Sequence, residues 1–234
     1  MGLITQQDGA VLRLTIDRPQ VRNALNEEVM LALTAQLAAI DHNSAVRAIV
    51  LTGSGDRAFC AGADLTPAQG TFANPHGRPT TVYADLLRVA YRLPVPLIAR
   101  VNGHCMAGGV GLVSFCDMAV AAANATFGLP EVKVGLFPMQ VAALLQKILP
   151  PRKFAEMCLT GEPISAADAL DLGLVNYVVP FEELDAKVDW LVSRTIDKSP
   201  TAIRRGKHAL RTIAGMNFDE AIAHMEYRDD RFVA

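Results

Sequence analysis

The 234-residue chain lacks the sequence features of several protein classes. It has no run of about 18 apolar residues, the length a membrane-spanning helix needs, and no N-terminal basic segment followed by an apolar one. It has no stretch of five or more like charges, and its formal net charge is −2. Neither a nucleic-acid-binding surface nor a polybasic membrane-binding patch is therefore expected. We expect a cytoplasmic protein whose partners are small molecules or copies of itself.

Sequence patterns for metal, dinucleotide and serine-hydrolase chemistry are also missing. No Cys-x-x-Cys pair occurs, and no histidine has metal-ligand spacing with another candidate ligand, so no metal site and reduced thiols are expected. The Gly-x-Gly-x-x-Gly pattern of dinucleotide sites fails, because from Gly109 and Gly111 its last position is Ser114. No Gly-x-Ser-x-Gly elbow is present. The four cysteines are Cys60, Cys105, Cys116 and Cys158.

The composition favours a large buried core, because 51% of the residues are hydrophobic and only 20% are charged. Hydrophobic periodicity and capping signals predict helices that follow strands in repeated strand-strand-helix units, and then a helical tail. Such an order favours an α/β spiral of repeats over a doubly wound sheet. The expected division is a core over residues 1–180 and a helical C-terminal region over residues 181–234. Strands are expected at 10–17, 47–52, 96–101, 117–122 and 175–179, and helices at 27–40, 82–92, 108–116, 139–149, 152–159, 166–172, 181–197, 200–214 and 217–228.

Two glycine- and alanine-rich segments follow predicted strands, at residues 58–65 and 102–112. Small residues let the backbone approach a ligand closely and turn its amides toward it. The second segment also opens a predicted helix, whose first amides have no partner within the helix and favour negative charge. A purely structural reading stays open for both: a tight surface loop in the first, and glycines that permit close helix packing in the second. His104, within the second segment, is interpreted as a structural residue.

Glu131 lies on an apolar loop after Pro130. Partial desolvation there would raise the pKa of its carboxyl group toward the range useful for moving protons. The alternative is an exposed glutamate in a surface salt bridge, for which Lys133 is the nearest candidate partner.

Taken together, these segments resemble the crotonase superfamily, that is, the enoyl-CoA hydratase/isomerase family. The resemblance covers nearly the whole chain, and the order and spacing of the motifs make it specific. The motifs are Arg18-Pro19, Asn23-Ala24-Leu25-Asn26, residues 58–65, residues 102–112, Phe127-Gly128-Leu129-Pro130-Glu131, Thr160-Gly161 and residues 166–175.

The resemblance implies a crotonase-like spiral of ββα units with a helical C-terminal trimerisation region, assembled as a homotrimer or homohexamer. It implies one further helix past residue 234. It also implies an acyl-CoA thioester substrate, with coenzyme A as part of the substrate and no other cofactor, and a place in fatty acid metabolism. By motif position, the N–H groups of Ala63 and Gly108 would bind the thioester oxygen in an oxyanion hole. Residues implied to contact the CoA ester are Arg22, Ala61, Asp64, Leu65, Gly111 and Gln140.

The sequence departs from the two-glutamate hydratases of that family at one position. Their first glutamate falls on Gly111 here and their second on Glu131, which indicates a single-glutamate subgroup. One carboxylate beside an oxyanion hole suffices to move a proton between C2 and C4, as in the family's isomerases. The sequence is also similar to single-glutamate hydratases of branched glutaconyl-type esters. Hydration and isomerisation thus both stay open, and the rival is a non-catalytic crotonase-like acyl-CoA-binding or scaffold protein.

Overall fold

The structure is a computed structural model of the 234-residue chain, and it describes residues 2–43, 45–64 and 81–229. A six-stranded sheet forms its centre, in the order β1-β2-β3-β5-β7-β10. A four-stranded sheet, β4-β6-β8-β9, stands beside it. The ten strands are β1 (Leu3–Asp8), β2 (Val11–Ile16), β3 (Ala48–Gly53), β4 (Ala58–Cys60), β5 (Leu97–Val101), β6 (His104–Met106), β7 (Met118–Ala122), β8 (Thr126–Gly128), β9 (Ile164–Ser165) and β10 (Tyr177–Val179).

After α1, three successive turns of the chain (β3-β4-α2, β5-β6-α3 and β7-β8-α4) each give one strand to each sheet and then a helix. The central pairs β2-β3, β3-β5, β5-β7 and β7-β10 are parallel, and so are β4-β6 and β6-β8. The predicted α/β class and its strand-strand-helix repeat are therefore confirmed. The α-helices are α1 (Glu27–Ala38), α2 (Val82–Tyr91), α3 (Gly108–Phe115), α4 (Met139–Leu145), α5 (Pro151–Thr160), α6 (Ala166–Asp171), α7 (Leu184–Ile196), α8 (Pro200–Ile213) and α9 (Phe218–Asp229).

Some boundaries differ from the expected ones. The glycine-rich segments contain the three-residue strands β4 and β6, which are too short to show a period of two. Strand β1 was not expected because its exposed residues are mostly polar. Helix α4 ends at Leu145, not at residue 149. Helix α1 begins as expected, with Asn26 Oδ1 accepting a hydrogen bond from Val29 N at 3.0 Å.

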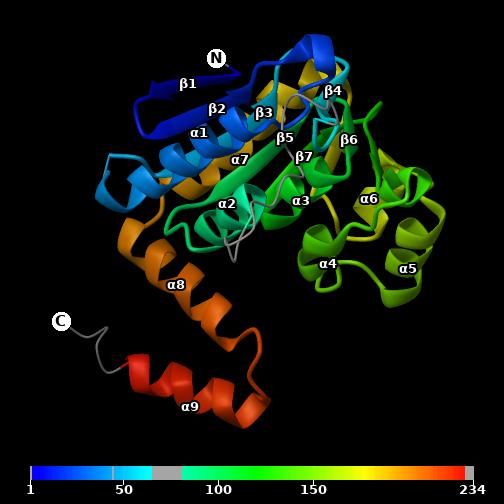
Figure 1. Ribbon diagram of the computed structural model, residues 1–234. Helices are drawn as coiled ribbons and strands as arrows, with labels where there is room; N and C mark the ends of the chain where they lie inside the picture. Colours follow the sequence, from blue (N-terminus) through cyan, green and yellow to red (C-terminus); the bar gives the residue numbers. More distant parts are fainter. Residues whose placement is uncertain (1, 44, 65–80, 230–234) are drawn as a thin grey trace.

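The central sheet is covered on both faces (Figure 1). Helices α1, α2 and α3 pack on one face, where the larger core cluster includes Leu33, Leu86 and Leu112. Helix α7 packs on the other, with Val188 and Leu191 against Val50 and Ile98. Parallel strands buried on both faces explain why β3, β5 and β7 are nearly continuous apolar runs.

The C-terminal helices α8 and α9 extend away from the sheets (Figure 1). Helix α8 is anchored to the segment before β5, because Lys207 Nζ donates to Val95 O at 2.6 Å and Arg211 Nη1 donates to Leu93 O at 2.8 Å. Leu210 and Phe218 are 66% and 78% exposed, as an assembly interface would require. Trimer or hexamer formation stays a prediction, and so does the division at residue 180, since α7 shares its core with the sheet.

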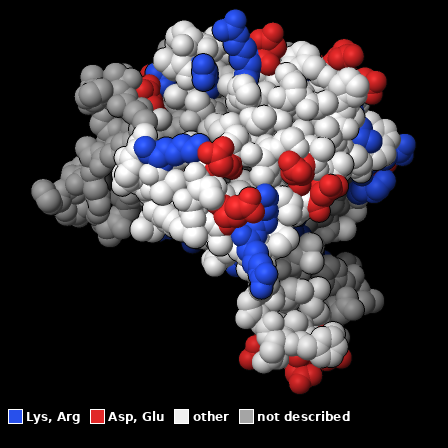
Figure 2. Space-filling view, turned by 90° about the vertical axis from the view of Figure 1, so that its right-hand side faces the viewer, with Lys and Arg blue, Asp and Glu red and all other residues white. Residues whose placement is uncertain are grey.

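Charged residues are interspersed on the face shown in Figure 2, where blue and red side chains alternate without forming one large patch of a single sign. In the part of the chain that the structure describes, no helix combines the length and the apolar character needed to cross a membrane. All four cysteines are free thiols.

Candidate active site

The three predicted catalytic residues follow three neighbouring strands of the four-stranded sheet. Ala63 follows β4, Gly108 follows β6 and Glu131 follows β8. The strands run parallel in the order β4-β6-β8, so their carboxyl ends lie at one edge of the sheet. The topology therefore brings together residues that lie up to 68 positions apart in the sequence.

The amide of Ala63 is available for a ligand. Residues 61–64 run beside residues 22–25: Leu25 N donates to Gly62 O at 2.7 Å and Asp64 N donates to Leu25 O at 2.8 Å. This parallel bridge leaves the N–H of Ala63 unused, and it donates to no other residue in the described ranges. Gly62 has φ +91°, and a Cβ there would lie 3.3 Å from Gly108 N, which places the two segments against each other.

The amide of Gly108 follows a residue with a strained backbone conformation. Ala107 has φ 52° and ψ −123°, a conformation that costs a non-glycine residue about 1–3 kcal/mol. Its N–H donates to Gly128 O at 2.8 Å, which ties the start of α3 to the end of β8. As the first residue of α3, Gly108 has no partner for its N–H within the helix, and it donates to none of the other described residues.

Glu131 carries a buried oxygen without a partner. It sits in the 3-10 helix η4 (Pro130–Val134), and its Oε2 is buried without a hydrogen bond to any described residue. Burial raises the pKa of its carboxyl group above the ordinary value of 4.5. Lys133 pairs instead with Glu162, its Nζ lying 2.7 Å from Oε1. The surface salt bridge considered for Glu131 is thus not formed with Lys133.

The raised pKa predicts a pH-dependent stability. A carboxyl group whose pKa is higher in the folded state stabilises the fold below its unfolded-state pKa, and this contribution is lost as pH rises through the folded-state pKa. Glu131→Gln removes the titration. The variant should therefore melt above wild type at pH 8, and the difference should shrink toward pH 4. Thermal unfolding followed by circular dichroism at both pH values checks this; a difference independent of pH would contradict it.

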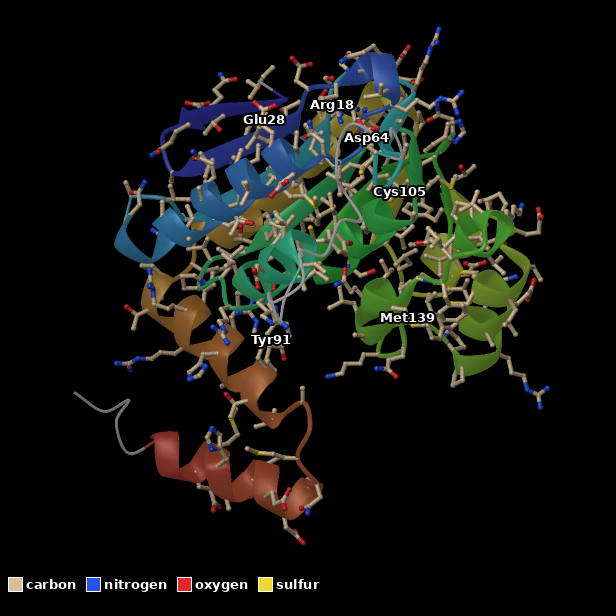
Figure 3. The ribbon with its side chains drawn as sticks, viewed as in Figure 1. Arg18, Glu28, Asp64, Tyr91, Cys105 and Met139 are labelled. Atoms are coloured by element: carbon tan, nitrogen blue, oxygen red, sulfur yellow. The ribbon has the colours of Figure 1, made fainter. Side chains whose placement is uncertain are left out.

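The residues implied to contact CoA fall into two groups. Arg22, Ala61 and Asp64 lie together, since Ala61 N donates to Arg22 O at 3.0 Å. The Asp64 carboxylate is turned inward, where Arg18 Nη2 donates to its Oδ2 at 2.8 Å (Figure 3). Leu65 lies outside the described residues. The CoA-binding roles of this group stay predictions.

The second group, Gly111 and Gln140, lies toward α4. Gln140 Nε2 donates at 2.7 Å to Oγ1 of Thr81, and that oxygen also accepts from Ala84 N and caps α2. Gln140 thus ties α4 to α2, and its role toward substrate stays a prediction. A Cβ on Gly111 would lie 2.1 Å from the Tyr83 hydroxyl oxygen. Sequence reasoning missed Tyr83, because no local pattern relates it to a glycine on another helix.

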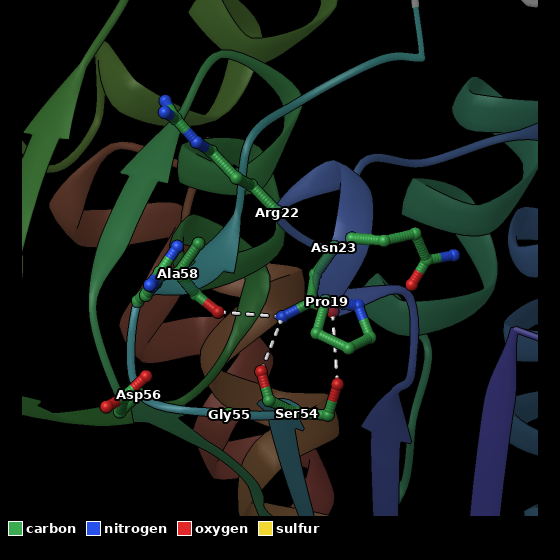
Figure 4. A pocket seen from close by; sticks show the side chains of 9 residues that line it. Pro19, Arg22, Asn23, Ser54, Gly55, Asp56 and Ala58 are labelled. Atoms are coloured by element: carbon green, nitrogen blue, oxygen red, sulfur yellow. Dashed lines mark hydrogen bonds between the residues drawn. The ribbon is translucent and has the colours of Figure 1, made fainter.

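Two asparagines of the sequence motifs support the site from behind. Asn23 Nδ2 donates to Ala58 O at 2.7 Å and to Ser54 O at 3.0 Å, and Asn102 Nδ2 donates to Gly55 O at 2.7 Å. Both side chains are buried and brace the turn from β3 to β4. A cavity of about 310 Å³ lies in front of Asn23 (Figure 4). None of the three predicted catalytic residues lines it, so it is not the candidate active site.

His104 and the thiols take no part in the candidate site. His104 Nδ1 is 2.7 Å from Thr126 Oγ1, in agreement with a structural role. Burial raises the pKa of the Cys60 thiol to about 12, and it also raises that of Cys105. Among the described residues, no group of three or more histidine, cysteine, aspartate or glutamate side chains could hold a metal ion.

Comparisons with known proteins agree with this arrangement. Residues 6–230 match the enoyl-CoA hydratase/isomerase family. The chain is 32% identical to a crotonyl-CoA hydratase of Syntrophomonas wolfei, over 95% of this chain and 86% of that protein. It is 34% identical to a carnitinyl-CoA dehydratase of Escherichia coli K12, over 94% of this chain and 84% of that protein.

A solved structure agrees with the fold as well. The crystal structure of an enoyl-CoA hydratase of Mycobacterium smegmatis superposes with a TM-score of 0.88 at 34% identity, over 97% of this chain and 89% of that one. The chain therefore belongs to the enoyl-CoA hydratase/isomerase family and is an enzyme of the hydratase/isomerase class.

Proposed function

We propose that the chain acts on an enoyl-CoA thioester, whose enolate is stabilised by the N–H groups of Ala63 and Gly108 while Glu131 moves the proton. The observation that carries the proposal is the buried Oε2 of Glu131, which has no hydrogen-bond partner among the described residues and lies at the sheet edge where the two amides also have none within those residues. A buried polar atom without a partner is costly. A ligand that binds there would offset that cost.

The two amides are suited to the charge that the reaction creates. An enolate concentrates negative charge on the thioester oxygen, and each fixed N–H donor at such an oxygen is typically worth about 2.7–4 kcal/mol in the transition state. The strained conformation of Ala107 supports this role, because the surrounding structure, including the hydrogen bond from Ala107 N to Gly128 O, maintains it before substrate binds.

The raised pKa of Glu131 suits proton transfer in both reactions. In hydration, a water oxygen bonds to C3 as Glu131 takes its proton. The electron pair of the C2=C3 double bond then forms a C1=C2 bond while the carbonyl pair moves onto the thioester oxygen, and Glu131 returns the proton to C2 as the carbonyl re-forms. In isomerisation, Glu131 removes a proton from C2 of a 3-enoyl ester and returns it at C4. The two relatives named above are a hydratase and a dehydratase, which supports addition and elimination of water.

Separate incubations with 2-enoyl-CoA and 3-enoyl-CoA esters test this function, including a branched glutaconyl-type ester. We expect a 3-hydroxyacyl product from the 2-enoyl ester, or migration of the double bond in the 3-enoyl ester. A chain that binds these esters and converts none of them would instead be the acyl-CoA-binding or scaffold protein.

We further propose that the chain works in the cytoplasm, in fatty acid metabolism, with coenzyme A as part of its substrate and no other cofactor. The acyl-CoA chemistry of the family supports the metabolic assignment.

A further inference from the structure

Tyr83, on the first turn of α2, fills the space beside Gly111. A Cβ on Gly111 would lie 2.1 Å from the hydroxyl oxygen of Tyr83 and 3.3 Å from its Cζ. Atoms this close would overlap, so Tyr83 in its present position excludes a side chain at residue 111. The phenol group therefore occupies the position where the side chain of the family's first glutamate, which falls on Gly111, would begin.

The Tyr83 hydroxyl is joined to the candidate active site through Gly108. Its hydrogen is donated to Gly108 O at 2.7 Å. A phenol has one hydrogen to donate, and its oxygen also accepts. With the hydrogen committed to Gly108, the oxygen remains able to accept a hydrogen bond from a small molecule.

The Tyr83 phenol also lies within electrostatic reach of Glu131. Its pKa is raised well above 10, first by burial and then by electrostatic interactions with Cys60, Cys105 and Glu131. The phenol is therefore neutral near neutral pH. Glu131 has a free oxygen that can take up a proton. The Tyr83 oxygen can accept a hydrogen bond, but the phenol does not readily lose its own proton.

We propose that Tyr83 replaces the carboxylate missing at position 111 by accepting a hydrogen bond from the water that adds to C3, so that the water presents its other hydrogen to Glu131. This inference rests on the proposed function and deepens it. The water oxygen bonds to C3, one water proton passes to Glu131 and then to C2, and the hydrogen that points at Tyr83 stays on the new hydroxyl group. Tyr83 itself gains and loses nothing.

A merely structural Tyr83 would behave differently from a water acceptor. If the hydroxyl only holds the first turn of α3, its loss would disturb the Gly108 amide and slow every step that needs the enolate. If it orients water, its loss would slow the addition of water but spare enolate formation. Proton exchange at C2 of a saturated ester reports on the enolate alone, because no water is added.

Tyr83→Phe tests the proposal, with Tyr91→Phe as the matched control on the same helix. Tyr91 is 43% exposed and stacks with Arg211, a contact that phenylalanine retains. Crotonyl-CoA and a branched glutaconyl-type ester measure hydration, and butyryl-CoA in deuterated water measures C2 exchange. Tyr83→Phe should lower kcat for hydration about 10²-fold, a loss that a misplaced reactant can cause, and leave C2 exchange near the wild-type rate. Tyr91→Phe should match wild type in both assays.

Three results would overturn this role of Tyr83: equal loss of both rates in Tyr83→Phe, no loss of hydration, or a wild type that exchanges C2 protons but hydrates neither ester. Glu131→Gln in the same assays distinguishes a failure of the Tyr83 role from a failure of the proposed function. If that variant retained C2 exchange, the proposed function itself would fail, whatever Tyr83 does.

Discussion

Glu131→Gln should lower turnover by about 10²–10⁴-fold, the range contributed by a positioned acid-base group. Glutamine has nearly the shape of glutamate but cannot take up a proton at the buried Oε2 position. Because the substitution changes neither the Ala63 nor the Gly108 amide, the affinity for a CoA ester should change little. Steady-state kinetics on the ester that proves active, together with calorimetric titration of a non-reactive CoA ester, measure both quantities.

Glu162→Gln is the matched control for this variant. Glu162 pairs with Lys133, which lies two residues after Glu131 in the sequence. The Glu162 side chain is 69% exposed. The same chemical change there should leave turnover at the wild-type level. Unchanged turnover in Glu131→Gln would end the assignment of Glu131, and an equal loss in both variants would point to a general disturbance of η4.

Asp64→Ala should have the largest effect on stability, lowering the free energy of unfolding by about 3–5 kcal/mol. Arg18 and Asp64 form a largely buried ion pair, with side chains 14% and 6% exposed (Figure 3). Removing the carboxylate leaves the Arg18 charge buried with Ala24 O as its other acceptor, at 2.6 Å. For a chain of this size, the melting temperature should fall by roughly 6–20 °C.

Glu156→Ala provides the comparison for a surface pair. Glu156 contacts Lys153 with side chains 57% and 31% exposed, and such pairs are typically worth about 0–1 kcal/mol. Urea and thermal unfolding of both variants should separate them clearly. If Asp64→Ala unfolded like the control yet bound a CoA ester more weakly, its carboxylate would be the ligand contact that the family resemblance implies, and the structural role argued for it would be wrong.

The parts of the fold that follow from local pattern could be predicted from the sequence. Asn26 and Thr81 cap α1 and α2 as their side-chain chemistry dictates. The strands β3, β5 and β7 are apolar because both faces of the sheet are covered. The three-residue strands β4, β6 and β8 are set by pairing with distant segments, which no local period records.

The same distinction applies to the candidate site. Glu131 and the two small-residue segments could be recognised because the signal for each lies in a few consecutive residues. The contacts that these segments make with distant residues could not be predicted. They are Asp64 with Arg18, Lys133 with Glu162, and Gly111 with Tyr83 on another helix. A glycine in the sequence does not reveal what fills its space.

Deuterium incorporation at C2 of butyryl-CoA tests the central claim most directly, because it needs the two amides and Glu131 but neither added water nor a double bond. Wild type should incorporate deuterium from D₂O, measured by mass spectrometry, and Glu131→Gln should not, although both bind the ester. Incorporation at equal rates in the two proteins would contradict the account.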